Sequence, residues 1–376
     1  MLLNGGFSVL YSSLFGMRFS QRALLAVVLL LLMAASASLG LFLRPESSLP
    51  VHLINQSGPW ASETTCIECH HQAIHFAKTG HANTLLAATS QPSLDLLKRF
   101  EKTSQKSTNI TLDLDSETVT ATHHPQGENE QQITLDWCFG SGKHARTWVG
   151  LLPDSWGADD LVEFRYTWYS KMGAFDTTPG QPSQPDPGYF GHLGVLYDHP
   201  KTRRCFACHA TRLQLDHGEI DFHTMLPGVT CQRCHGPRGE HVTTIGKVGF
   251  NQWRGIDHVE AVHRCAECHR REEDVKGEQI VPENTHLARF QPVGLMRSKC
   301  FESEKMTCTI CHDPHLPLAQ QQLDQAGQCV QCHDGATAAQ PVCAAGHQDS
   351  CVECHMPKVK SDNDLYFTDH WIRVRY

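Results

Sequence analysis

Cysteine and histidine recur in one short pattern along this chain of 376 residues. The pattern is Cys-x-x-Cys-His, it occurs seven times, and it accounts for 14 of the 17 cysteines. We number its copies motif 1 (66–70), motif 2 (205–209), motif 3 (231–235), motif 4 (265–269), motif 5 (308–312), motif 6 (329–333) and motif 7 (351–355).

The spacing within each motif suits covalent attachment of haem. Two thiols on one short helical turn can reach the two vinyl groups of a porphyrin, and the histidine that follows can aim its imidazole at the iron. Residue frequencies predict roughly 0.05 copies by chance, so seven copies require a chemical explanation. Zinc sites do not need a histidine after every second cysteine, and a disulfide framework leaves the histidines unexplained.

We therefore expect seven covalently bound haem c groups, each holding one iron. The expected attachment residues are Cys66, Cys69, Cys205, Cys208, Cys231, Cys234, Cys265, Cys268, Cys308, Cys311, Cys329, Cys332, Cys351 and Cys354. The expected proximal iron ligands are His70, His209, His235, His269, His312, His333 and His355.

The remaining 18 of the 25 histidines exceed the seven that a second axial imidazole on every iron would need. A second imidazole affects the redox potential of the iron. Five candidates stand near motifs: His81, His241, His315, His347 and His370. His315 is too close to its own motif 5 to reach the opposite face of that haem easily, so we expect it to bind a neighbouring one.

Other histidines and the methionines are weaker candidates. The weaker histidine candidates are His144, His223 and His286, while His123 and His124 lie in a polar, turn-like stretch and are expected to be solvated. Methionine ligation has little support.

Three cysteines lie outside the motifs: Cys138, Cys300 and Cys343. A disulfide between Cys300 and Cys343 is one interpretation. The other is that all three are small buried side chains.

The N-terminus carries an export signal. Arg18 and Arg22 precede an uninterrupted apolar run over 23–43, which predicts that the rest of the chain is translocated to the periplasmic side of the plasma membrane. The run is long enough for an uncleaved membrane anchor, which we favour, while Ala35-Ser36-Ala37 resembles a signal-peptide cleavage site. The net charge of −8 and the scattered basic residues argue against a nucleic-acid partner.

Motif spacing divides the chain into an N-terminal signal or anchor (1–45), a first haem segment (46–95), a β-rich insert (96–190) and a six-haem cluster (191–376). Strands are expected over 110–114, 118–122, 133–137, 145–151 and 161–169, where apolar residues alternate. Gaps between the last six motifs leave little room for sheet. We therefore expect a mainly α and irregular fold organised around stacked haems, with a small β-rich insert at about 105–170.

The sequence also resembles a known family over most of residues 60–374. The matching stretches are SETTCIECHHQAIHFAKTGHA, CFGSGKHARTWV, GVTCQRCHGPRGEHV, RFQPVGLMRSKCF, TCTICHDPH, and CVECHMPKV followed by FTDHWI. They are similar to multihaem cytochromes related to the nitrifier tetrahaem cytochrome c and to hydroxylamine oxidoreductase. The resemblance implies bis-histidine haems in parallel-stacked and perpendicular pairs, with His81, His241, His315 and His370 as distal ligands.

Two functions remain open. A carrier would pass electrons between redox partner proteins, such as a quinol-oxidising membrane complex and a soluble cytochrome or terminal reductase. An enzyme acting on a small nitrogen or sulfur compound would need one five-coordinate haem. The absence of a Cys-x-x-Cys-Lys motif and the ample histidines favour the carrier, with no catalytic residue assigned.

Overall fold

The computed structural model describes residues 58–103, 109–125, 129–153, 160–185, 190–248, 253–321, 325–333, 351–362 and 365–375. The expected signal or anchor segment lies outside these residues. In the part of the chain that is described, no helix is both long and apolar enough to cross a membrane.

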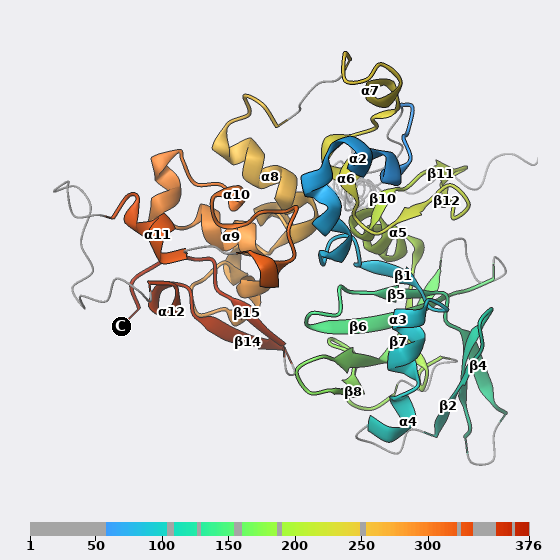
Figure 1. Ribbon diagram of the computed structural model, residues 1–376. Helices are drawn as coiled ribbons and strands as arrows, with labels where there is room; N and C mark the ends of the chain where they lie inside the picture. Colours follow the sequence, from blue (N-terminus) through green and yellow to red (C-terminus); the bar gives the residue numbers. More distant parts are fainter. Residues whose placement is uncertain are drawn as a thin grey trace, which may run out of the picture. The chain divides into compact units, whose positions relative to one another are not determined.

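The largest sheet is antiparallel and has six strands (Figure 1). They are β1 (Leu85–Ala87), β5 (Trp137–Phe139), β6 (Ala145–Leu151), β7 (Leu161–Tyr169), β8 (Ala174–Thr177) and β9 (Gly194–Tyr197). The order is β1-β5-β6-β7-β8, and β9 also pairs with β7, along residues 161–164. Strand β7 is central and is buried over nearly its whole length, as its run of apolar and aromatic residues requires.

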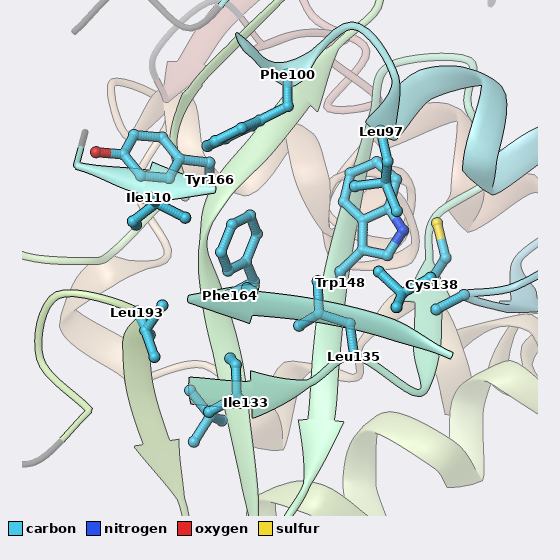
Figure 2. Close-up of a cluster of buried hydrophobic side chains, with 14 of the residues drawn as sticks. Leu97, Phe100, Ile110, Ile133, Leu135, Cys138, Trp148, Phe164, Tyr166 and Leu193 are labelled. Atoms are coloured by element: carbon cyan, nitrogen blue, oxygen red, sulfur yellow. The ribbon is translucent and has the colours of Figure 1, made fainter. Parts of the chain in front are cut away.

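A second sheet and two short helices pack against the six-stranded sheet. The sheet comprises β2 (Ile110–Leu114), β3 (Val119–His123) and β4 (Gln131–Thr134), and the helices are α3 (Gln91–Leu97) and α4 (Phe100–Thr103). Their apolar side chains meet those of β5 to β8 in one cluster, where Trp148 and Phe164 are fully buried (Figure 2). The Trp148 indole Nε1 donates a hydrogen bond to Ser93 Oγ at 2.7 Å, which satisfies the buried donor.

The opposite face of the sheet packs on the helix that carries motif 2. Val149 and Leu161 from the sheet cluster with Phe206 and Ala207, which belong to α5 (His199–His209). Asp198 caps this helix by accepting a hydrogen bond from the Lys201 backbone N–H at 3.2 Å. The insert is therefore joined to the haem-motif region by a shared apolar core.

The rest of the described chain consists of short elements. The helices are α2 (Glu63–Cys69), η2 (His71–Lys78), α6 (Cys231–His235), α7 (Gly239–Thr243), α8 (His258–His269), η3 (Glu272–Asp274), η4 (Gly277–Gln279), η5 (Thr285–Arg289), α9 (Gln291–Met296), η6 (Lys299–Ser303), α10 (Cys308–Cys311), η7 (Leu318–Gln320), α11 (Gln325–Val330) and α12 (Cys351–His355). The strands are β10 (Ala210–Arg212), β11 (Leu215–Asp216), β12 (Glu219–Ile220), β13 (Leu226–Pro227), β14 (Lys358–Asp362) and β15 (Leu365–Thr368).

The expectation of a mainly α and irregular fold is wrong. Several small antiparallel sheets run through the chain, including the ribbons β10–β13, β11–β12 and β14–β15 among the last six motifs. The gaps between motifs are short, but they still allow sheet, because an antiparallel ribbon needs only a few residues and a tight turn. The large sheet also uses β1 and β9, which flank the expected insert at 96–190.

The expected strands 110–114, 145–151 and 161–169 coincide with β2, β6 and β7. The expected strand 133–137 is divided between β4 and β5, which belong to different sheets. His123 was expected to be solvated but is 5% exposed, because it continues the buried alternation of β3. His124 is exposed and contacts Thr111 and Glu130.

Candidate haem-binding site

Each motif begins in a short helix: α2, α5, α6, α8, α10, α11 and α12 carry motifs 1 to 7 in order. In motifs 1, 5 and 6 the backbone N–H of the histidine donates to the carbonyl of the first cysteine at 2.9 Å. These are i to i−4 hydrogen bonds of one helical turn. The turn that brings two thiols to one side is thus formed by the chain itself.

Four proximal histidines lie opposite a second histidine. His70 pairs with His241 and His235 pairs with His315, with ring centroids 6.3 and 6.2 Å apart. The other two pairs join His312 to His370 at 6.1 Å and His269 to His81 at 6.0 Å. All four distal candidates that the family resemblance implies are therefore brought opposite a motif histidine.

This spacing fits one metal ion between two rings. Two metal–imidazole bonds of about 2.0–2.1 Å, with the bonding nitrogen about 1.1 Å from its ring centroid, place the centroids about 6.2–6.4 Å apart. Direct stacking is much closer, as in His123 and His192, whose parallel rings are 4.2 Å apart. The four wider pairs fit the axial ligands of a haem iron.

The ring planes divide the pairs into two kinds. The angle between planes is 19° for His70 and His241, 17° for the pair with His315 and 34° for the pair with His370. The fourth pair, His81 and His269, is close to perpendicular at 84°.

Backbone carbonyls hold two of these rings in one tautomer. The Nδ1–H of His370 donates to the Thr368 carbonyl at 2.8 Å, and that of His241 donates to the Val248 carbonyl at 3.2 Å. A ring that donates from Nδ1 keeps the Nε2 lone pair for a metal. His315 makes a comparable contact with Asp313 Oδ1 at 3.1 Å.

Burial favours the neutral, metal-binding form of these rings. It lowers the pKa of His81 to about 4, and the neighbouring His269 adds to the shift. Burial is also the largest cause of the lowered pKa of His235, His269, His312 and His370. Because iron binds neutral imidazole, these environments prepare the rings for ligation.

Motif 2 is arranged differently. Among the residues that the structure describes, no second imidazole faces His209 at the pair spacing. Its Nδ1 lies 3.0 Å from the Thr84 carbonyl and 2.7 Å from the Thr84 hydroxyl, and Phe139 packs edge-on against its ring at 5.0 Å. Thr84 orients His209 although it is far away in the sequence.

The other candidates are placed as follows. His355 Nδ1 of motif 7 lies 3.0 Å from the Arg373 carbonyl, whereas His144 packs on Phe367. Neither His223 nor His286 belongs to one of the four pairs.

The three cysteines outside the motifs are only partly described. Cys138 is fully buried in the insert core, where burial raises its pKa to about 11, and it acts there as a small apolar residue. Cys343 and His347 lie outside the described residues, so the expected disulfide with Cys300 and the fifth distal candidate stay predictions.

Comparison with known proteins gives local matches. A family model described as "Cytochrome c554 and c-prime" matches residues 192–236, which contain motifs 2 and 3. Multiheme cytochrome MtrA of Shewanella baltica (strain OS185) is 26% identical over 155 residues, covering 31% of this chain and 46% of the relative. The chain is related to the multihaem c-type cytochromes.

This chain spans about half the length of that relative. The solved structure of the outer cell wall cytochrome OcwA has a TM-score of 0.46 and 14% identity, covering 84% of this chain and 79% of the other. An undecahaem cytochrome from the S-layer of Carboxydothermus ferrireducens has a TM-score of 0.45 and 14% identity, covering 84% and 52% of the two chains. None of these matches singles out the nitrifier and hydroxylamine oxidoreductase group.

Sequence reasoning missed the residues that orient the ligands. Val248 and Thr368 use main-chain carbonyls, which any residue type provides, so no sequence signal could have revealed them. Thr84 uses both its carbonyl and its hydroxyl, and its distance from motif 2 in the sequence concealed it. The sequence also does not predict which distal histidine pairs with which proximal histidine. This pairing depends on contacts between segments up to about half the chain apart.

Proposed function

We propose that this protein is an exported heptahaem c-type cytochrome that transfers electrons through a chain of mostly bis-histidine haems. The observation that carries the proposal is the set of four histidine pairs with centroids 6.0–6.3 Å apart. A haem held between two imidazoles takes up and releases single electrons without exchanging a ligand. Each pair joins a motif histidine to a histidine from another segment.

The protein's own residues keep these ligands in place. The Nδ1–H bonds of His241 and His370 to main-chain carbonyls fix the ring orientation. Ligands that move little between oxidation states suit a carrier, because little reorganisation accompanies each electron.

Mass spectrometry and electron paramagnetic resonance test the proposal together. Holoprotein made with c-type maturation should carry seven haems, and its oxidised irons should be low-spin. Replacing one distal ligand, as in His241→Ala, should convert one haem to high spin. His223→Ala removes an exposed histidine outside the pairs and should leave the spectrum unchanged. Five or fewer haems, or a low-spin spectrum that survives His241→Ala, would contradict the proposal.

The second candidate is a multihaem oxidoreductase acting on a small nitrogen or sulfur compound. The observation that favours it is motif 2, where no second imidazole faces His209 within the described residues. A five-coordinate haem at motif 2 would give a high-spin signal in the wild type that shifts with nitrite or hydroxylamine. Such a signal, lost when Cys205 and Cys208 are both replaced by serine, would make the enzyme the better description.

We further propose that the chain functions on the periplasmic side of the plasma membrane, held by residues 23–43 and exchanging electrons with a quinol-oxidising complex and a soluble cytochrome or terminal reductase. The support is the basic flank and apolar run of the N-terminal segment. Membrane fractionation combined with N-terminal sequencing of the mature protein distinguishes an anchor from a cleaved signal. A soluble product beginning shortly after Ala37 would refute the anchor.

A further inference from the structure

Attachment cysteines of different motifs lie against one another. In motifs 1 and 3, Cys66 Sγ, Cys231 Sγ and a carboxylate oxygen of Glu63 all lie within 4.8 Å of one another. The fully buried Gln232 fixes this contact: its amide donates to the Ala61 carbonyl at 2.8 Å and to Glu63 Oε1 at 2.7 Å. Motifs 1 and 3 are therefore neighbours although Cys66 and Cys231 are 165 positions apart in the sequence.

Motif 4 makes contacts of this kind on two sides. The Cys208 thiol of motif 2 is hydrogen-bonded to Cys268, and its Sγ lies 3.9 Å from the Glu267 carbonyl oxygen. The other cysteine of motif 4, Cys265, is hydrogen-bonded to Cys308 of motif 5. Helices α8 and α10 lie side by side at this second contact.

Motif 3 also reaches motif 4. Arg233, between the two cysteines of motif 3, is 9% exposed and is hydrogen-bonded to the Cys268 thiol. The same guanidinium donates from Nη2 to the Ala207 carbonyl of motif 2. Cys234 of motif 3 also interacts with Cys268. Three motifs thus converge on one buried arginine.

Motifs 5, 6 and 7 contact one another in sequence order. Helix α10 of motif 5 contacts α11 of motif 6, and α11 contacts α12 of motif 7. Cys329 and Cys351 are hydrogen-bonded across the second contact.

Since each thiol forms a thioether at a vinyl edge of its haem, touching thiols bring the edges of two haems together. We propose that motif 4 is a three-way junction whose neighbours are motifs 2, 3 and 5. Electrons then have one through route along motifs 1, 3, 4, 5, 6 and 7, and one side branch to motif 2. Each transfer oxidises one ferrous iron and reduces the neighbouring ferric iron. The inference rests on the proposed function only for the use of the route.

The branch ends at the insert. Motif 2 is carried by α5, which packs on the six-stranded sheet, and Phe139 of β5 touches His209. The six-stranded sheet therefore lies beside the side branch.

The test uses the motif 4 haem as its own reporter. Its ligands, His81 and His269, have near-perpendicular planes. Perpendicular imidazoles give ferric haem a low-spin signal with one large g value, distinct from the rhombic signal of near-parallel pairs. A paramagnetic neighbour alters the width and relaxation of such a signal.

We expect this reporter signal to change in holoprotein in which Cys205 and Cys208 are both serine, and in His315→Ala, which makes the neighbouring motif 3 iron high-spin. It should stay unchanged in His241→Ala, the matched change at motif 1, which the proposed route connects to motif 3 and not to motif 4. If the double serine variant carries fewer than six haems, Cys208→Ser alone, with the haem still held by Cys205, should change the signal.

An unchanged signal in the motif 2 or motif 3 variants, or an equal change in His241→Ala, would overturn the junction. These outcomes are independent of the carrier proposal, which fails instead if the wild type has a substrate-responsive high-spin iron.

Discussion

Gly294→Ala tests whether close backbone packing positions the proposed distal ligand His370. An alanine Cβ at 294 would lie 2.7 Å from the Trp371 backbone nitrogen and 3.0 Å from the His370 carbonyl carbon. Ordinary contact begins at 3.4 Å, so the two segments must separate by about 0.7 Å. Ser298 Oγ accepts from the Ile372 N–H at 2.8 Å and also bonds the Gly294 carbonyl, so helix α9 and this segment are tied together.

A metal–ligand distance tolerates a change of only about ±0.2 Å. A displacement of 0.7 Å therefore exceeds what the proposed bond from His370 to the motif 5 iron can absorb. Overpacking costs about 1–3 kcal/mol, which a domain of this size survives. We expect the variant to fold with its full number of haems and to convert one of them to high spin.

Electron paramagnetic resonance and carbon monoxide binding to the reduced protein measure the converted haem, and mass spectrometry counts the haems. Gly277→Ala is the control, since a Cβ there meets nothing within 4 Å. If Gly294→Ala keeps its full number of haems and stays entirely low-spin, the packing argument or the ligand assignment is wrong.

Three further changes address the core, the titration of the insert and the ligand planes. Phe164→Ala, at a fully buried position, should cost about 3–5 kcal/mol in chemical denaturation with the number of haems unchanged; a cost below 1 kcal/mol would contradict the described core. Burial raises the pKa of Asp136 above its ordinary 3.8 although the Leu151 N–H donates to its carboxylate, so the wild type should lose stability as the pH rises from about 3.8 through the folded pKa. Asp136→Asn should not show this loss, and parallel stability profiles for the two proteins would refute the shift. His81→Ala should remove the large-g signal and leave the rhombic signals; loss of a rhombic signal instead would mean that His269 has another partner.

Local pattern predicted much of the insert, because period-two alternation is a property of a few consecutive residues. Strand β7 was predicted to the residue, because apolar and polar residues alternate along most of Leu161–Tyr169. The boundary between β4 and β5 was missed because Asp136 turns the chain from one sheet to the other. Its carboxylate accepts from the Leu151 N–H of β6, a contact that sequence neighbours do not reveal.

The haem-binding site also has a part that the local sequence predicts and a part that it does not. Proximal ligands follow from the motif alone, and distal candidates follow from histidines near motifs and from family resemblance. Which ring opposes which depends on tertiary contacts. His241, six residues after motif 3, faces motif 1, while His315, just after motif 5, faces motif 3.

The long separation within each histidine pair sets an order for assembly. His70 and His241 are 171 positions apart, and a chain that is synthesised and exported from its N-terminus presents the first long before the second. On the proposed pairing, a haem already attached at motif 1 has only one protein ligand between these moments. Motif 4 is the exception among the four pairs, because its proposed second ligand, His81, is already present when His269 emerges. A nascent or truncated chain would therefore leave a coordination position of the iron open to reaction. Rapid synthesis of the C-terminal half would shorten this exposure and so protect the protein.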